Sequence, residues 1–426
     1  MSILKDIPEL VSAEVISQET ADRIHAYYHS KGGQNQSRLL IVFGILGSLL
    51  VGLGIILIIA HNWDELSKAT KTLLAFVPLV IGQTLCGYTL LKKQDSTAFR
   101  ESSSAFLFIA IAANISLIAQ IYNISGDFNR FLLTWMLLGL PLVYLMRSSA
   151  ASLFYIAGIT YYAGHWSYSN TEFNYYWLLL VLIVPHYYLL FKRYPYSNFM
   201  VFHNWLIPIS MLYGLFPIVI TGKSSELMIV AYSSILGLYC LIGNSDFFNS
   251  QKIRNSSYKI IGTLGTVIVL LTLSFDFFWS HLRIQNYQFS QIVTSQEFLA
   301  TAIVTLVSTV LFILDRIKKP LREIKVFEPI FILFAITFII GLTSPFAVVL
   351  DNILVLGIGI FTIRDGAKSD HLGVMNYGLL IITALVVCRF FDTHWSFVTR
   401  GILFLIVGVG FFLTNFLMLK KRKVNE

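Results

Sequence analysis

The chain has 426 residues, of which 56% are hydrophobic and only 13% are charged, and its formal net charge is +8. Soluble globular domains contain about 25% charged residues, so this composition excludes a soluble globule and predicts an all-α, polytopic helical membrane protein. The positive charge does not indicate a nucleic-acid partner, because the basic residues stand in short segments that flank apolar stretches.

The first 37 residues are polar and predict a short cytoplasmic helical hairpin. Ser17 is a suitable N-cap and Glu19 stands in the first turn that follows, where the helix dipole favours a carboxylate. A shorter apolar stripe precedes Ser17, and the segment 31–37, with Gly32 and Gly33, predicts a flexible linker. We expect a structural cap, with binding of a protein partner as the alternative.

After the linker, the segment 38–419 predicts a bundle of about fourteen transmembrane helices, followed by a basic tail, 420–426. Fourteen spans divide into seven plus seven, as in transporters built from inverted repeats. The predicted spans are 39–60, 72–91, 103–120, 131–146, 149–164, 175–191, 201–221, 227–242, 258–278, 298–314, 327–342, 346–363, 373–391 and 399–418.

The basic residues are distributed unequally between alternate segments of this topology. Of the 31 lysines and arginines, 24 fall on the side that holds both termini and 7 fall on the other. Because cytoplasmic segments are enriched in Lys and Arg, both termini are predicted to be cytoplasmic.

Polar residues gather at the predicted outer ends of spans. Asn62, Trp63 and Asp64 follow the first span, and Gln120 and Asp127 mark the end of the third. Six of the seven tryptophans, Trp279 among them, have such positions, which is typical of the aromatic belt at a membrane surface. The amide and carboxylate beside Trp63 leave two interpretations, a helix end with an interface anchor or a ligand contact.

These residues carry a resemblance to a known family. Ser17-Gln18-Glu19-Thr20-Ala21, the run Gly52-Leu53-Gly54 leading to Ala60-His61-Asn62-Trp63, and Gln120 to Asp127 followed by Trp135 resemble the bacterial membrane-protein family catalogued as domain of unknown function 2157. The resemblance covers residues 10–150. It implies a multi-pass protein of the bacterial inner membrane, and it implies no chemistry and no catalytic residue.

Ionisable groups inside spans are functional candidates, because a central Asp costs roughly 2.5–3.5 kcal/mol on insertion scales. Asp351 and Asn352 lie in the twelfth predicted span, Asp276 near the outer end of the ninth, and Arg389 near that of the thirteenth. Either an aspartate pairs with Arg389 as structural support, or the group binds a ligand. Glu328 and His203 stand near cytoplasmic ends, where they can snorkel to the interface.

The expected ligand-binding residues line one outward-facing polar cavity, in which Asp351 and Arg389 lie close together. They are Asn62, Trp63, Asp64, Gln120, Asp127, Asp276, Asp351, Asn352 and Arg389. No metal or cofactor is expected, since Cys86, Cys240 and Cys388 lie in separate apolar stretches without a C-x-x-C pair.

Three function classes fit this sequence. A transporter or channel uses many spans and polar residues that line a cavity. A non-catalytic scaffold or sensor would use the N-terminal hairpin as its contact. An enzyme acting on a lipid-linked substrate is the least favoured, because the outer loops are short and no catalytic motif is present. The expected partners are membrane lipids, a small polar ligand or ion, and a protein at the hairpin.

Overall fold

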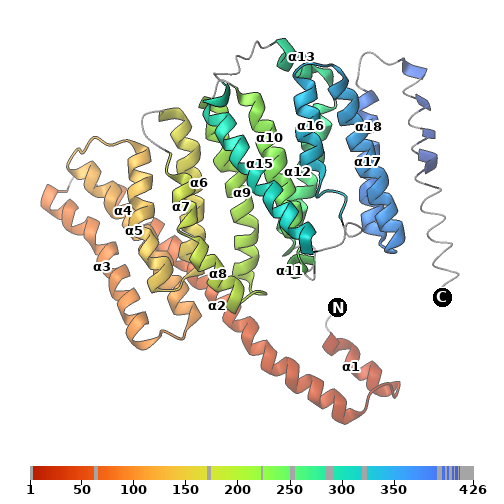
Figure 1. Cartoon of the computed structure of the whole chain (residues 1–426). Coiled ribbons are helices and arrows are strands. Elements are labelled where there is room, and N and C mark those ends of the chain that lie inside the picture. The colour runs from red at the N-terminus through yellow and green to blue at the C-terminus, as the bar shows by residue number, and fades with distance from the viewer. Residues whose placement is uncertain are drawn as a thin grey trace. The chain divides into compact units, whose positions relative to one another are not determined.

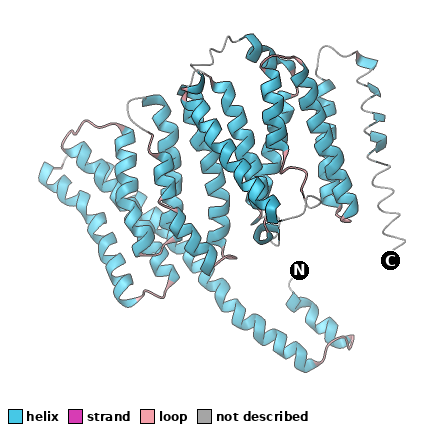
Figure 2. Ribbon diagram, in the orientation of Figure 1, coloured by secondary structure: helices cyan, strands magenta, loops and turns pink. Residues whose placement is uncertain are grey.

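The computed structural model describes residues 3–61, 66–169, 174–221, 224–249, 255–284, 292–318 and 324–390, together with short pieces between 396 and 412. Every regular element in these ranges is a helix, as Figures 1 and 2 show, which confirms the all-α prediction. The chain divides into two compact units, Met1–Met200 and Val201–Glu426.

The first unit is organised around α4, which packs against α2, α3, α5 and α6 (Figure 1). Its buried core includes Phe108, and the indole Nε1 of Trp135 on α5 donates to the Phe108 carbonyl oxygen at 2.8 Å. The helices are α1 (Ile3–Ser12), α2 (Gln18–His61), α3 (Lys68–Lys92), α4 (Thr97–Ile121), α5 (Phe128–Leu145), α6 (Ser149–Ser169), α7 (Tyr176–Val181) and α8 (Val184–Arg193).

The N-terminal helices agree with the sequence analysis up to the predicted linker. The Ser17 hydroxyl accepts from the Thr20 backbone N–H at 3.3 Å, so Ser17 caps α2, and α1 contacts α2. However, α2 is one helix of 44 residues that continues through 31–37. The flexible linker was therefore a wrong prediction. Glycine costs a helix only about 1 kcal/mol each, and propagation adds one hydrogen bond for every residue. The division of 1–37 from the bundle stays a prediction.

The second unit is organised around α10, which packs against α12, α15 and α16, while α17 and α18 form a closely packed pair. A Cβ on Gly378 of α18 would lie 2.7 Å from the carbonyl oxygen of Gly359 on α17, so this close approach requires glycine. The elements are α9 (Asn198–Thr221), which begins at the end of the first unit, η2 (Ser225–Leu227), α10 (Met228–Gly243), α11 (Asp246–Asn249), α12 (Ser257–Leu273), α13 (Asp276–Ile284), α15 (Gln296–Lys318), α16 (Ile330–Gly341), α17 (Phe346–Lys368) and α18 (Leu372–Phe390).

The described residues contain eight helices that are long and apolar enough to cross a membrane, or nine if α12 and α13 together form one span. The eight correspond to the predicted spans in α3, α4, α5, α9, α10, α15, α17 and α18. The chain is thus a multi-pass membrane protein, but the predicted number of fourteen spans is not supported.

Short and broken helices explain why some of the fourteen predicted stretches are not candidate spans. Helix α16 has 12 residues, which reach about 18 Å and cannot cross a hydrocarbon layer of about 30 Å. The stretch 175–191 is divided into α7 and α8, and Pro185 stands in the first turn of α8. The stretch 258–278 is divided into α12 and α13, which are bent by 68°. Apolar composition alone gave no sign of these interruptions.

The other predicted stretches are missing from the candidate spans because of their composition or because they lie partly outside the described residues. The stretch 149–164 does form a helix, α6, but its tyrosines, serines and histidine lower its hydropathy, and it is not among the candidate spans. Within 39–60, the apolar helical part that is described runs from Val42 to Gly54. The last predicted span, 399–418, lies largely outside the described residues.

Candidate functional site

A break between α12 and α13 forms the centre of the candidate site. Helix α12 ends at Leu273, α13 begins at Asp276, and the two are bent by 68°. The last carbonyls of a helix have no partners within it, and here side chains supply them. The Ser274 hydroxyl donates to the Leu271 carbonyl oxygen at 2.7 Å, and Asn352 Nδ2 of α17 donates to the Ser274 carbonyl oxygen at 2.9 Å.

Trp279 of α13 stabilises the break by packing in the core and donating a hydrogen bond to the end of α12. Its side chain is fully buried, and its Nε1 donates to the Leu273 carbonyl oxygen at 2.7 Å. A Cβ on Gly341 of α16 would lie 2.3 Å from the Trp279 ring, so the glycine provides the space for the indole. Trp279 is therefore not a ring of the aromatic belt, as the sequence predicted, but part of the core. A buried indole requires an acceptor, and the broken helix offers one.

The packing of α17 against α18 determines which polar residues meet at this break. The two helices are antiparallel, and a Cβ on Gly359 would lie 2.5 Å from Ile382. Asp351 lies eight residues before Gly359 on α17, and Phe390 lies eight residues after Ile382 on α18. In an antiparallel pair, Asp351 is therefore opposite Phe390, the neighbour of Arg389. Aspartate and arginine therefore lie at the same end of the pair.

Arg389 reaches the break directly. Its Nη2 donates to the Ser274 hydroxyl oxygen at 3.0 Å, and its guanidinium carbon lies 4.6 Å from the centre of the Phe275 ring. Ser274 thus contacts three helices: it belongs to the end of α12, its carbonyl accepts from Asn352 on α17, and its hydroxyl accepts from Arg389 on α18. Asn352 and Arg389, two of the predicted site residues, therefore bind the same residue, Ser274.

Asp351 is buried beside this cluster without a hydrogen bond. Its relative exposure is 0%, and neither carboxylate oxygen has a hydrogen-bond partner within the part of the chain that the structure describes. The positive charge of Arg389 acts on Asp351, but the guanidinium hydrogen-bonds to Ser274. Buried polar groups are nearly always paired, so a carboxylate with both oxygens unsatisfied requires an explanation.

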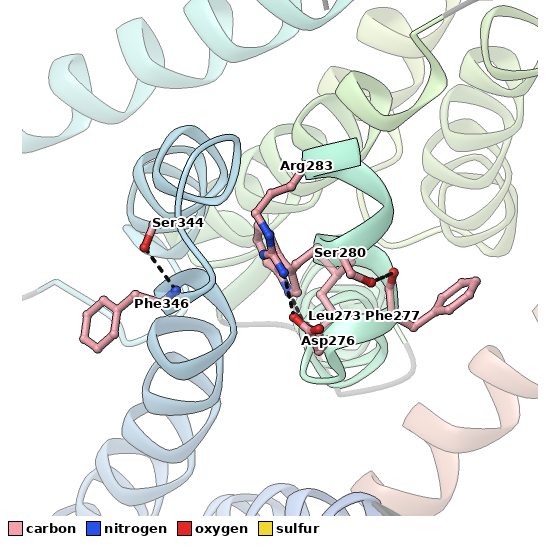
Figure 3. A network of polar contacts seen from close by, with 8 residues as sticks. Leu273, Asp276, Phe277, Ser280, Arg283, Ser344 and Phe346 are labelled. Atoms are coloured by element: carbon pink, nitrogen blue, oxygen red, sulfur yellow. Dashed lines mark hydrogen bonds and ion pairs between the residues drawn. The ribbon is translucent and has the colours of Figure 1, made fainter. Parts of the chain in front are cut away.

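Asp276 does not join the cluster. It pairs with Arg283 of the same helix at 3.1 Å, and its side chain is 60% exposed. Figure 3 shows the Arg283 side chain folded back onto Asp276, two turns away on the same face of α13. Of the two aspartates that the sequence offered as a partner of Arg389, Asp276 therefore pairs instead with Arg283, on a helix that is bent away from the direction of α12. Ser344 accepts from the Phe346 backbone N–H at the start of α17 (Figure 3).

The remaining predicted site residues belong to the first unit. Asn62, Trp63 and Asp64 lie outside the described residues. Gln120 and Asp127 are exposed, and Asp127 stands before α5 without a side-chain capping bond. A shared cavity for all nine residues stays a prediction.

The sequence analysis missed Glu101, a buried carboxylate in the first unit. Its exposure is 2%, and it accepts from the Ser148 hydroxyl at 2.6 Å and from the backbone N–H groups of Ser149 and Ala150 at 3.1 and 2.7 Å. Glu101 of α4 thus satisfies the free N–H groups at the start of α6. The pair Ser148-Ser149 before an apolar run was the available signal, but no sequence pattern linked it to Glu101.

Glu328 and His203 are also buried, which contradicts the expectation that they snorkel to the interface. Glu328 accepts from Asn244 Nδ2 at 3.0 Å and from the Lys325 backbone N–H at 3.2 Å, and it pairs with Arg316 at 3.4 Å. It therefore connects α10, α15 and the segment before α16 as a structural ion pair. Among the described residues, no group of three or more His, Cys, Asp or Glu side chains could hold a metal ion.

Comparison with known proteins identifies only the first part of the chain. Residues 8–152 match the family model described as Predicted membrane protein (DUF2157), from α1 into the first turn of α6. No curated protein and no solved structure matches the chain. The match does not reach the break between α12 and α13, and its description assigns no activity. The resemblance seen in the sequence is confirmed: the N-terminal part of this multi-pass membrane protein is similar to the DUF2157 family of predicted membrane proteins.

Proposed function

We propose that the protein is a transporter-like bundle that moves a small polar ligand or ion across the membrane, with its functional site at the break between α12 and α13. The observation that carries this proposal is Asp351, a fully buried carboxylate whose oxygens have no hydrogen-bond partner in the described structure. It lies beside two polar side chains that bind the broken helix, Asn352 and Arg389.

The energetic argument is direct. An isolated ionised carboxylate is so costly in apolar surroundings that it takes up a proton or acquires a partner. A purely structural carboxylate would be expected to have donors, as Glu101 and Glu328 do. Ionisable residues inside spans mark pathways for ions or substrates.

The broken helix supports the same proposal. Transporters place their sites at discontinuous helices, whose unwound carbonyls are available to ligands. In this chain the carbonyls of Leu271, Leu273 and Ser274 accept from the side chains of Ser274, Trp279 and Asn352, and Leu271 also accepts from the Ser274 backbone N–H at 3.4 Å. A change at any of these side chains alters the break, so the geometry is suited to moving between two arrangements.

We also propose the bacterial inner membrane as the location, with both termini in the cytoplasm. The basic residues of 31–38 and of the tail 420–426 support this orientation. Reporter fusions at residue 426 test it. A cytoplasmic reporter should be active there, and activity of a reporter that functions only outside the cytoplasm would overturn it.

One observation favours a second candidate function. Because α2 runs without interruption from the N-terminal hairpin to the apolar part Val42–Gly54, a protein bound at the hairpin could act on the membrane part through a continuous helix. The protein would then be a sensor or scaffold and not a transporter.

Reconstitution tests the transport proposal. The purified protein is placed in liposomes that contain a pH-sensitive dye, and the internal pH is followed after a step in external pH. The wild type should carry protons faster than empty liposomes, Asp351→Asn should lose this flux, and Asp276→Asn, on an exposed carboxylate, should keep it. Equal rates for the wild type and empty liposomes would overturn proton transport and favour the sensor.

A further inference from the structure

We infer that the ligand of Asp351 is a proton, and that Arg389 exchanges between Ser274 and Asp351 as this proton binds and leaves. The inference rests on the proposed function, because it names the ion that acts at the same site. It adds a mechanism by which one proton changes the break between α12 and α13.

The starting state is the arrangement of the described residues. Arg389 Nη2 donates to the Ser274 hydroxyl oxygen at 3.0 Å, while both oxygens of Asp351 are buried without a hydrogen bond. An uncharged carboxylic acid fits this arrangement, since it does not compete for the guanidinium. An ionised carboxylate beside Arg389 would instead attract it, because hydrogen bonds between guanidinium and carboxylate are about twice as strong as neutral ones.

A metal cation does not fit the same position. Metal cations require several oxygen ligands, and the two Ser274 oxygens already accept from Asn352 and Arg389. The guanidinium charge that acts on Asp351 would also repel a second cation. A proton needs only the carboxylate itself.

Other charged groups in the described structure do not replace Arg389 as the partner of Asp351. Helix α16 contains no ionisable residue. On α13, Asp276 pairs with Arg283, and His281 is 59% exposed and lies 3.8 Å from Glu226. The other ionisable groups of the neighbouring elements are Tyr258 and Lys259 at the start of α12, Arg364, Asp365 and Lys368 at the far end of α17, and Tyr377 and Cys388 on α18. Asp392 lies outside the described residues.

Loss of the proton then has a structural consequence. When Asp351 becomes ionised, Arg389 moves to it and leaves the Ser274 hydroxyl. Ser274 keeps its contact with Asn352, the residue next to Asp351, but loses its link to α18. Helix α13, which follows Ser274 directly, is then held less firmly. Proton release is thus coupled to a movement of α13.

Infrared difference spectroscopy of the purified protein tests proton binding. A pH change should produce the C=O stretching band of a buried protonated carboxyl group, and growth on isotopically labelled aspartate should move that band to lower frequency. This comparison needs no variant, so it does not depend on the folding of a mutant. A band that labelled aspartate leaves unmoved, or the absence of any band, would overturn the inference. The band should disappear in Asp351→Asn and persist in Asp276→Asn.

Labelling of α13 tests the coupling. In a protein with Cys388→Ser and Ser280→Cys, the rate at which a maleimide modifies residue 280 is divided by its rate with free cysteine at the same pH, because the thiolate is the reactive form. This ratio should rise when the pH is raised through the midpoint of the infrared band. Asp351→Asn and Arg389→Gln should remove this dependence. A pH dependence that persists in both variants would overturn the exchange of Arg389.

The two experiments separate this inference from the proposed function. If the aspartate band and the labelling change are present but liposomes show no flux, the proton switch stands and transport is wrong. If the proton flux depends on Asp351 but no aspartate band is found, proton transport stands and the binding of the proton on the Asp351 carboxyl group is wrong.

Discussion

Two buried carboxylates, one in each unit, differ in their donors and not in their burial. Glu101 of α4 has 2% exposure and accepts three hydrogen bonds, from one hydroxyl and two backbone N–H groups. Asp351 of α17 has 0% exposure, and none of the described residues donates to it. Burial alone therefore does not separate a structural carboxylate from a functional one. The set of donors does.

The difference follows from the position of each carboxylate relative to a helix start. Glu101 reaches the first turn of α6, where free N–H groups and the positive end of the helix dipole favour an acceptor. Asp351 lies more than one turn inside α17, which begins at Phe346. The N–H groups there are engaged within the helix. The first arrangement fixes two helices together, whereas the second leaves a group that a ligand can satisfy.

The largest expected loss of stability tests the packing of α17 against α18, which positions Asp351. Gly378→Val would place a Cβ 2.7 Å from backbone atoms of Gly359 and Ile363, and backbone cannot move aside as a flexible side chain can. We expect a loss of at least 1–3 kcal/mol, the usual cost of overpacking, measured by thermal unfolding in detergent. Gly357→Val is the matched control, because nothing lies within 4 Å of a Cβ at that position. Equal melting temperatures for the two variants would contradict the described register of α17 and α18.

The second-largest loss of stability is expected for a change at Glu101, the structural carboxylate of the first unit. Glu101→Gln presents an amide NH₂ to donors that need an acceptor, and leaving buried groups unsatisfied costs about 1–3 kcal/mol. The melting temperature should therefore fall well below that of the wild type. A Glu101→Gln protein as stable as the wild type would mean that these three hydrogen bonds do not hold α4 to α6.

A smaller effect is expected at the break itself. Trp279→Phe keeps an aromatic ring beside Gly341 but removes the donor to the Leu273 carbonyl oxygen. We expect a loss of about 1 kcal/mol, that of one net hydrogen bond. Trp177→Phe, at a half-buried ring, is the comparison. A larger loss at Trp177 would argue against the role of Trp279.

The smallest effect on stability is expected at Asp351. Asp351→Asn removes a carboxylate that makes no hydrogen bond in the described structure, so the melting temperature should stay near that of the wild type. The exchange of charges, Asp351→Arg with Arg389→Asp, should not restore a lost ion pair. Marked destabilisation by Asp351→Asn, rescued by the exchange, would show instead that the pair is structural support.

Much of the fold followed from the sequence because hydrophobicity and length are local properties. The all-α class, eight of the predicted spans and the Ser17 cap are confirmed. The break after Leu273 could not be predicted in this way, because neither glycine nor proline marks the run from Leu271 to Asp276. It depends on contacts from distant helices, those of Asn352 and Arg389.

The candidate site was predicted in part for the same reason. The cost of burying charge in a span singled out Asp351 and Arg389, and the structure places them at one end of α17 and α18. The sequence left open whether Asp276 or Asp351 is the partner of Arg389, because the bend that turns Asp276 toward Arg283 was not visible in it. Glu101 was missed, because its three donors lie in a turn more than forty residues further along the chain.

A double comparison of proton flux and stability tests the central contrast most directly. Flux into liposomes is measured for Asp351→Asn and Glu101→Gln, divided by the amount of folded protein, and compared with each variant's melting temperature. Asp351→Asn should lose the flux and keep the wild-type stability, while Glu101→Gln should keep the flux per folded molecule and lose stability. The opposite pattern, with flux lost only in Glu101→Gln and stability lost only in Asp351→Asn, would contradict the assignment of both carboxylates.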